Sequence, residues 1–181
     1  MEWLPRLATM NDVPALELLV PLSVKKLHAP YYSVDQINAA LGPVFGVDRQ
    51  LIADETYFVI EQGRQIVGCG GWSRRKSLFG SDLGRTFEDN YLIPDIDPAR
   101  IRAFFVHPEF SRKGIGRAIL RTCEKAVRQA GFHRIELVAT LAGEPLYLSE
   151  GYEILERYDI PLSNGLGLPA VRMGKLLKKF E

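Results

Sequence analysis

The clearest hydrophobic pattern in the chain is a helical one between residues 114 and 131. Apolar side chains recur there every three or four residues, as on the buried face of an amphipathic helix. They are Ile115, Ile119, Leu120, Cys123, Ala126, Val127 and Ala130. The intervening positions, which we expect to face solvent, are Arg117, Arg121, Glu124, Lys125 and Arg128. Gly131 then stands where a helix commonly has its C-terminal glycine cap.

Strands are predicted where apolar and aromatic residues cluster without the helical period. These runs cover residues 5–8, 57–61, 65–72, 101–106, 134–140, 152–160 and 170–177. A turn at residues 62–64 joins the second and third runs into a hairpin. Gly68, Gly70 and Gly71 indicate a bulge or a close backbone approach in the third run.

A long helix is predicted near the N-terminus. Thr9 and Asp12 have the spacing of a helix start, and we expect Pro21 to kink or split the helix that follows. Its predicted buried positions are Leu16, Leu19, Leu22 and Val24.

Two shorter helices complete the predicted elements. Ser33 is a good N-terminal cap for a helix at residues 34–41, and residues 143–150 form another. The pattern favours no element at residues 44–54, and residues 77–98 show no clear periodicity.

The segment between the strand at residues 101–106 and the long helix has the features of an anion-binding turn. His107-Pro108 ends the strand because proline cannot extend the hydrogen-bond ladder. The first N–H groups of a helix lack intrahelical partners and carry partial positive charge. Since Gly114 and Gly116 have no Cβ, a phosphate could approach this backbone closely. Further positive charge comes from Arg112, Lys113 and Arg117.

On these residues alone, the turn is either a phosphate cradle or an ordinary strand-to-helix turn with a solvated basic rim. The Walker pattern of nucleotide-binding proteins is absent. A Rossmann fingerprint requires a third small residue, and Ile119 occupies that position.

Composition indicates one globular domain, residues 1–181, because 46% of the residues are hydrophobic and 25% are charged. The net charge of +1 favours neither nucleic acid nor a membrane surface as a partner. Cys69 and Cys123 lie far apart without a Cys/His cluster, so we expect free buried thiols and no metal site. The sequence shows no signal peptide or membrane span, which favours a cytoplasmic location.

Residues 106–120, VHPEFSRKGIGRAIL, resemble the acyl-CoA signature of the GNAT superfamily of N-acetyltransferases. That signature reads Arg/Gln-x-x-Gly-x-Gly/Ala after a Val-His/Asp-Pro strand end. Gly114 and Gly116 match its small positions, whereas Ser111 stands where Arg or Gln is usual and Arg112 offers a charge beside it.

A second GNAT motif, Asn-x-x-Ala-x-x-Phe-Tyr-x-x-x-Gly-Phe, is partly matched by residues 140–152. Tyr147 and Gly151 coincide with it. The positions that differ are Thr140, Gly143, Leu146 and Tyr152. The order of predicted elements also follows the family along nearly the whole chain.

The resemblance implies an α/β (α+β) fold, with a mixed, mostly antiparallel sheet of about seven strands flanked by about four helices. Strands 101–106 and 134–140 would be parallel and splay apart, and acetyl-CoA would bind in the opening as co-substrate. Its pyrophosphate would meet the turn, and its pantetheine amides the free strand edge. The implied cofactor-binding residues are Phe104, Phe105, Val106, Ser111, Arg112, Lys113, Gly114, Ile115, Gly116, Arg117 and Thr140.

The resemblance also implies an acyltransferase that moves an acetyl group to a primary amine, on a small molecule or a peptide, by direct attack. Tyr147 falls where the family places its general acid, and a phenol with a pKa of ~10 stays protonated at neutral pH. The alternative is that Tyr147 only packs on pantetheine. A backbone N–H near Val106 is expected to polarise the thioester carbonyl. The sequence identifies no general base, and we interpret His107 as a strand-end residue.

Charge suggests where the acceptor would enter. Residues 77–98 carry the carboxylates Asp82, Glu88, Asp89, Asp95 and Asp97. We expect them, with the loop at Tyr31 and Tyr32, to form the mouth for a cationic acceptor, although a solvated loop and simple aromatic packing stay open.

Two other functions also stay open on the sequence. One is a catalytically idle acyl-CoA sensor, and the other a protein that binds a different phosphate ligand at Gly114 and Gly116. The sequence is compatible with a homodimer.

Overall fold

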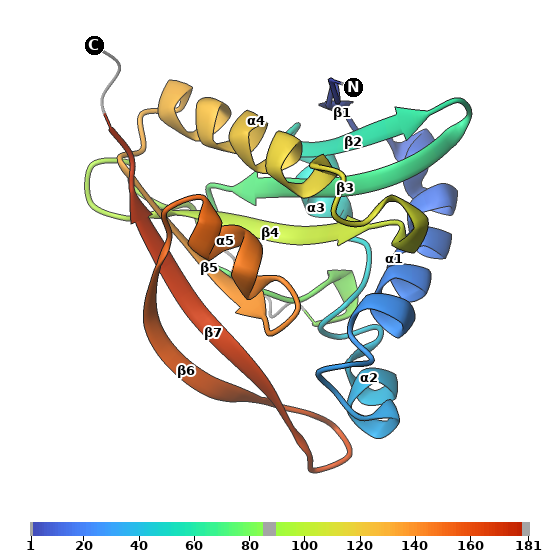
Figure 1. Cartoon of the computed structure of the whole chain (residues 1–181). Coiled ribbons are helices and arrows are strands. Elements are labelled where there is room, and N and C mark those ends of the chain that lie inside the picture. The colour runs from blue at the N-terminus through green and yellow to red at the C-terminus, as the bar shows by residue number, and fades with distance from the viewer. Residues whose placement is uncertain (1, 85–89, 179–181) are drawn as a thin grey trace.

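A single seven-stranded sheet organises the computed structural model, which describes residues 2–84 and 90–178 (Figure 1). Its strands are β1 (Arg6–Leu7), β2 (Tyr57–Gln62), β3 (Gln65–Ser73), β4 (Ala99–Val106), β5 (Arg134–Thr140), β6 (Glu153–Pro161) and β7 (Gly167–Leu176). The order across the sheet is β1-β2-β3-β4-β5-β7-β6. Neighbouring strands are antiparallel except β4 and β5, which are parallel. The predicted fold class is therefore confirmed.

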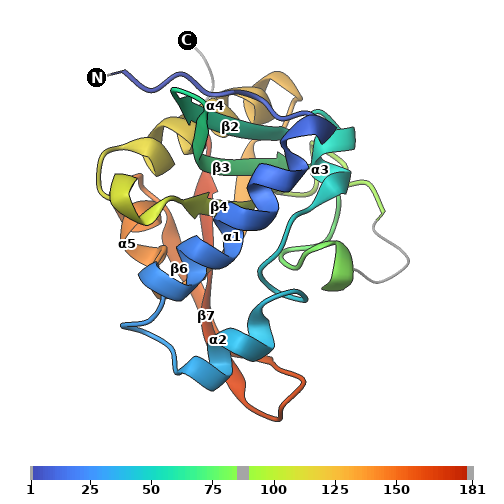
Figure 2. The ribbon, with the colours of Figure 1, turned by 90° about the vertical axis from the view of Figure 1, so that its right-hand side faces the viewer.

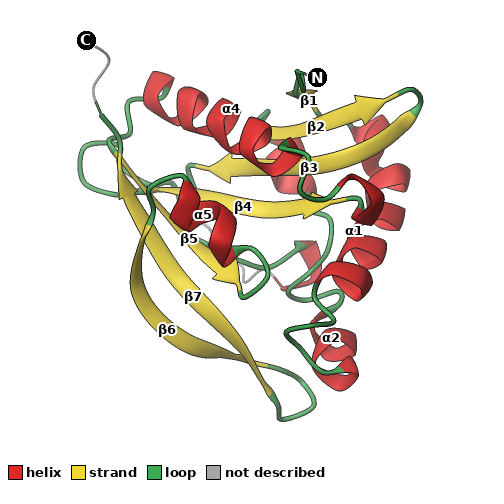
Figure 3. Cartoon of the chain, in the orientation of Figure 1, coloured by secondary structure: helices red, strands yellow, loops and turns green. Residues whose placement is uncertain are grey.

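Helices cover both faces of this sheet (Figures 2 and 3). The described α-helices are α1 (Val13–Leu27), α2 (Val34–Ala40), α3 (Arg49–Ala53), α4 (Ile115–Gln129) and α5 (Glu144–Ser149). Short 3₁₀ turns lie at Met10–Asp12, Asp82–Gly84 and Pro108–Phe110. One apolar core joins α1, α2 and α3 to the sheet, and a second core joins α4 and α5 to the other face.

The parallel pair β4/β5 opens the sheet. The two strands pair at Ala99 with Ile135 and at Arg100 with Glu136. Beyond these first residues they diverge toward their carboxyl ends, as Figure 1 shows. The V-shaped opening that the family resemblance implies is present.

Helix α1 differs from its prediction in two ways. It continues through Pro21 as one helix, so the expected split does not occur. A proline inside a helix removes one hydrogen bond, but the packing of residues such as Leu16 and Leu19 against the sheet compensates. Leu22 is 39% exposed rather than buried, and Val20 occupies the inner face instead.

Helix α4 follows its prediction closely but has one inward-facing charge. Gly131 adopts φ +89° just beyond the helix, as expected of a C-terminal cap. Glu124, which was expected on the solvent side, is only 5% exposed. Its carboxylate accepts hydrogen bonds from Lys175 Nζ at 2.8 Å and from the Tyr152 hydroxyl at 3.1 Å. The helical period could not reveal this, because Lys175 lies in β7 and Tyr152 just before β6, both far from α4 in the sequence.

Helix caps account for the short elements. Ser33 and Gln36 form the capping box of α2, as predicted for Ser33. Helix α3 falls in the stretch for which the sequence favoured no element, and the Asp48 carboxylate accepts hydrogen bonds from its first N–H groups. No described helix is both long and apolar enough to cross a membrane.

The predicted glycine and cysteine environments are also found. The register of β3 against β4 shifts between Cys69 and Gly71. A Cβ on Gly68 would lie 2.3 Å from Ile115 Cγ2, so α4 and β3 pack closely there. Cys69 and Cys123 are free and buried.

Candidate active site

A cavity of about 710 Å³ occupies the opening between β4 and β5. It reaches both faces of the sheet, because its lining includes Ser23 and Leu27 of α1 on one side and Leu146 and Tyr147 of α5 on the other. All of residues 101–106 line it between these ends. The cavity thus connects the two layers of helices through the sheet.

Strand β4 bulges where it borders the cavity. Ala103 has φ +57°, which is uncommon for a residue with a Cβ. The Tyr57 hydroxyl holds this conformation by donating a 2.7 Å hydrogen bond to the Ala103 carbonyl. A Cβ on Gly70, in the neighbouring strand, would lie 2.4 Å from Phe104 Cδ1, so Gly70 makes room for that ring.

The edge of β4 toward β5 is unpaired beyond Arg100. The His107 N–H donates to the Val67 carbonyl of β3 at 2.9 Å. Because amides alternate along a strand, the Val106 N–H points to the opposite side, into the opening. There it donates to Ser23 Oγ at 3.3 Å. This N–H, expected as a donor to the thioester carbonyl, therefore already has a partner.

The turn before α4 presents several backbone N–H groups. His107 Nδ1 accepts from the Glu109 N–H at 3.2 Å, so His107 caps the 3₁₀ turn in line with its interpretation as a strand-end residue. Arg112 and Gly114 adopt φ +62° and +86°. Left-handed residues alternating with right-handed ones turn successive N–H groups toward one point. The first N–H groups of α4, from Ile115 onward, also lack intrahelical acceptors.

The basic side chains of the turn have different surroundings. Arg112 and Arg117 line the cavity, and Arg117 is paired with Glu150 at 2.6 Å. Lys113 does not line the cavity and instead places its ammonium 5.0 Å from the Phe110 ring. Its carbonyl accepts a 2.7 Å hydrogen bond from Trp3 Nε1. Among the described residues, Arg117 is the one of the three with an ion-pair partner, and Arg112 lines the cavity without one.

Tyr147 lies deep in the same cavity and is 7% exposed. Its ring packs against Phe104 and Tyr152, with centroid distances of 6.2 and 5.7 Å. Burial raises the pKa of the Tyr147 hydroxyl above its ordinary value. Thr140 also lines the cavity, and its Oγ1 accepts from the Gly143 N–H at 3.0 Å, which fixes the start of α5.

The cavity wall on the α1 side is mainly apolar and aromatic. Its deep part includes Phe45 and Leu168, which are 6% and 1% exposed, and Tyr31 and Phe79 stand at the entrance, 47% and 40% exposed. His28 lies among them, 8% exposed, with its ring centroid 5.2 Å from that of Phe45. Burial lowers the pKa of His28 to about 4, so its imidazole is uncharged at neutral pH.

A family model described as the acetyltransferase (GNAT) domain matches residues 53–154, more than half of the chain. The chain belongs to the GNAT acetyltransferase family. The resemblance read from the two motifs is thereby confirmed. A comparison with curated protein sequences found no match.

Solved structures share the GNAT fold at low sequence identity. A GCN5-related N-acetyltransferase from Rhodopseudomonas palustris is 17% identical with a TM-score of 0.69, over 98% of this chain and 97% of that one. The PaiA N-acetyltransferase from Thermoplasma acidophilum, solved with coenzyme A, is 15% identical with a TM-score of 0.64, over 97% and 99%. YncA of Salmonella typhimurium, a putative acetyltransferase solved with acetyl-CoA, is 16% identical with a TM-score of 0.63, over 98% and 95%.

The prediction that carboxylates of residues 77–98 line the acceptor mouth is wrong for those that the structure describes. Asp82 pairs with Arg49 at 2.9 Å, Asp95 lies 3.5 Å from His133, and Asp97 accepts from the Ile93 N–H at 2.8 Å. None of these three lines the cavity. Glu88 and Asp89 lie outside the described residues. The segment does reach the cavity, but through Leu78, Phe79 and Gly80.

Of the two tyrosines predicted at the mouth, Tyr31 lines the cavity and Tyr32 packs in the interior. Tyr31 is at the cavity entrance, as the site interpretation expects. Tyr32 is 5% exposed and has a structural position. Its hydroxyl donates to the Pro169 carbonyl at 2.7 Å and accepts from the Leu141 N–H at 2.9 Å. It therefore ties the loop after α1 to the ends of β5 and β7.

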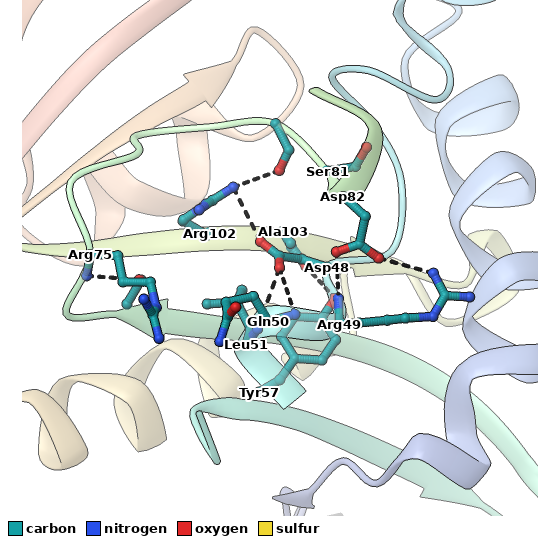
Figure 4. A network of polar contacts seen from close by, with 12 residues as sticks. Asp48, Arg49, Gln50, Leu51, Tyr57, Arg75, Ser81, Asp82, Arg102 and Ala103 are labelled. Carbon is teal, nitrogen blue, oxygen red and sulfur yellow. Dashed lines mark hydrogen bonds and ion pairs between the residues drawn. The ribbon is translucent and has the colours of Figure 1, made fainter. Parts of the chain in front are cut away.

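A buried ion pair at the cavity wall was missed by the sequence reasoning (Figure 4). Arg102 Nη2 lies 3.2 Å from Asp48 Oδ2 and donates to the Gly80 carbonyl at 2.6 Å. Both charged side chains are almost inaccessible, at 2% and 0%. The pair joins β4, the cap of α3 and the segment that carries Phe79. The available signal was a single arginine inside the otherwise apolar run at residues 101–106.

His28 and Ser23 were also missed as cavity residues. Both follow or belong to α1, far from the two motifs in sequence, and neither sits in a recognisable pattern. Ser23 is 2% exposed, and a lone serine on a buried helix face indicates a polar contact only once its partner is known.

Proposed function

We propose that this GNAT domain is an acetyl-CoA-dependent N-acetyltransferase that acts on a primary amine. The observation that carries the proposal is the continuous cavity through the sheet. It joins a turn rich in free backbone N–H groups to a buried tyrosine and then to a separate apolar compartment. A transferase needs these three parts in this order: a place for the donor's phosphates, a reaction centre and a place for the acceptor.

The residues around the turn fit a pyrophosphate. The φ values of Arg112 and Gly114 direct N–H groups toward one point, and the helix dipole of α4 favours negative charge there. Gly116 lines the cavity, and a Cβ there would already come within 3.0 Å of Leu146 Cδ2. In this proposal residues 111–117 bind the pyrophosphate, with Lys113 contributing backbone rather than side chain.

The unpaired edge of β4 fits the pantetheine arm. Residues 104–106 offer main-chain groups to its amides, as an added strand would pair with an open edge. Thr140, on the facing strand, borders the same channel. This use of backbone agrees with the small number of side chains that the family motif specifies.

Tyr147 is assigned as the general acid. Bound acetyl-CoA supplies an acetyl group as a thioester, whose C–S bond breaks as the amide C–N bond forms. The Tyr147 hydroxyl gives its proton to the departing sulfur and regains one from solvent, which receives the proton that the attacking amine releases. Because burial keeps Tyr147 protonated at neutral pH, this proton is available.

Two measurements on the purified full chain test the proposal. Calorimetry with acetyl-CoA, ATP and NADH should show binding of acetyl-CoA in preference to the nucleotides. Thiol release from acetyl-CoA should then depend on an added primary amine. Binding without amine-dependent thiol release would point to the acyl-CoA sensor, and preferential binding of ATP or NADH to a different phosphate ligand.

A further inference from the structure

The α1 side of the cavity is a distinct compartment, which we call the acceptor compartment. It is defined by Leu27, His28, Tyr31, Phe45, Phe79 and Leu168. Phe45 and Leu168 belong to the apolar core on the face of α1, opposite the face that holds Tyr147. The compartment therefore lies across the sheet from the phosphate-binding turn, and its lining includes the exposed side chains of Tyr31 and Phe79.

We infer that the acceptor is an amine with one cationic centre and an aromatic or bulky aliphatic group, bound with that group in the acceptor compartment and with its nitrogen near His28. The inference rests on the proposed acetyltransferase function and specifies its substrate class. Polyamines, aminoglycosides and lysine-rich peptides are disfavoured as acceptors.

The lining of the acceptor compartment is mainly apolar and aromatic. Burial of apolar surface is the main favourable term available in such a compartment, and aromatic rings pack well on Tyr31, Phe45 and Phe79. A short or strongly polar acceptor would leave these side chains facing water. An aromatic or branched group would cover them.

The described residues that line the cavity offer no carboxylate to a second positive charge. No Asp or Glu lines the cavity among the described residues. The nearby Asp48 is already paired with Arg102, which itself lines the cavity. A second ammonium on the acceptor would enter an apolar wall without a carboxylate to pair with, and burying an unpaired charge is costly.

His28 offers a hydrogen-bond acceptor to the amine. Its Nδ1 is buried and has no hydrogen-bond partner among the described residues, which is rare for a polar atom in a folded protein. The imidazole is uncharged at neutral pH, so it accepts a hydrogen bond from an amine without repelling it. An acceptor N–H placed at His28 would satisfy this nitrogen.

Equilibrium binding of matched amines, in the presence of CoA, tests the inference. Calorimetry compares 2-phenylethylamine with ethylamine, which differ by the ring, and 1,5-diaminopentane with pentylamine, which differ by the second charge. We expect the ring to tighten binding roughly tenfold or more, and the second charge to weaken it. Binding of 1,5-diaminopentane as tight as that of pentylamine, or tighter, would overturn the inference, as would no gain from the ring.

Two substitutions test whether the gain from the ring arises in the acceptor compartment. Phe79→Ala, at a partly exposed position, should weaken binding of 2-phenylethylamine about fivefold and leave ethylamine unchanged. Ile96→Ala, at a more exposed position outside the cavity, should change neither. Equal effects of both substitutions would contradict the proposed location.

His28 is tested by its own pair of variants. His28→Leu should weaken binding of every amine, roughly tenfold, and His28→Asn, which keeps a short hydrogen-bond acceptor, should restore part of it. Circular dichroism checks that both variants fold. Wild-type amine binding by a folded His28→Leu would remove His28 from the site.

Because these are binding measurements, they decide the substrate class independently of turnover. Thiol release is assayed in parallel with the same amines. If the selectivity is found without thiol release from any amine, the proposed catalysis fails while the binding preference stands. If thiol release occurs best with 1,5-diaminopentane, the catalysis stands and the inference fails.

Discussion

The hydroxyl of Tyr147 is the single atom on which the proposed chemistry depends most. Tyr147→Phe keeps the ring contacts with Phe104 and Tyr152 and deletes only the oxygen. Acyl-CoA affinity should therefore hold in calorimetry, while kcat falls by ~10²–10⁴-fold, the usual range for a general acid or base. Tyr158→Phe, outside the cavity, is the matched control. A kcat within about twofold of wild type would leave Tyr147 as a packing residue, with water as the proton donor.

His28 should make the stability of the fold sensitive to acid. Its pKa is about 4 in the folded protein because burial disfavours the imidazolium, against ~6.5 in the unfolded chain. Between these values the unfolded chain binds the extra proton, so stability falls as the pH drops from about 6.5 to about 4. The shift corresponds to about 3 kcal/mol.

Urea unfolding at pH 7.5 and pH 4.5 measures this contribution. From pH 7.5 to pH 4.5, the His28→Leu variant should lose about 2 kcal/mol less unfolding free energy than wild type does. This holds whatever the difference in stability between the two proteins at pH 7.5. Parallel losses in the two proteins would show that His28 titrates normally when folded.

At the scale of elements, a carboxylate added in the first turn of α4 should prevent acyl-CoA binding. Gly116→Asp adds a side chain within 3.0 Å of Leu146 and a negative charge where a pyrophosphate would bind. We expect calorimetry to show no acyl-CoA binding, with the circular dichroism spectrum unchanged. Arg112→Ala should weaken binding less, because it removes one screened charge and leaves the backbone N–H groups in place.

Gly63→Asp is the control for the same chemical change. Gly63 lies in the hairpin turn between β2 and β3, with open space around it, and Asp tolerates its left-handed conformation better than most residues. Its acyl-CoA affinity should equal that of wild type. Normal binding by Gly116→Asp would contradict a pyrophosphate site at this turn.

Local elements were predictable because their causes are local. The helical period between residues 115 and 129 and the glycine after it define α4 without any knowledge of the sheet. The hairpin of β2 and β3 follows equally from its turn. By contrast, the bulge at Ala103 depends on the Tyr57 hydroxyl and on the space above Gly70. Because both belong to other strands, no pattern within β4 could predict it.

At the scale of the whole molecule, the ion pair of Asp48 and Arg102 connects segments about 50 residues apart. Asp48→Asn keeps a good cap for α3 but removes the charge that faces Arg102. Removing one partner of a buried pair typically costs about 3–5 kcal/mol, since the other charge stays buried. Urea unfolding should show a loss of this size, and the double variant with Arg102→Met should lose less than the two single variants together.

The exposed pair of Arg49 and Asp82 provides the comparison. Arg49→Met removes the 2.9 Å ion pair with Asp82 and also a 2.8 Å pair with Glu17. Because this arginine is half-exposed, water screens both interactions and the stability should change far less. A small effect of Asp48→Asn, equal to that of Arg49→Met, would mean that water reaches Arg102 and that the segment around Gly80 is held by other contacts.

The sequence was sufficient to predict the order of strands and helices other than α3, the N–H-rich turn and membership of the GNAT family. These depend on the spacing of apolar residues, on glycines and prolines, and on motifs that are contiguous in the chain. The same information placed Tyr147 four residues before Gly151, which was enough to propose a role for it.

The surroundings of the opening between β4 and β5 depend on contacts in the folded chain. The tertiary structure buried Glu124, paired Asp82 with Arg49, and brought His28, Phe45, Phe79 and Leu168 to one wall. Local charge predicted an acidic mouth for a cationic acceptor, and the arrangement in space favours an acceptor with a single charge and an apolar group. The reason is physical: the field in a cavity depends on which side chains reach it and which are neutralised elsewhere, and both are set by contacts between residues far apart in the chain.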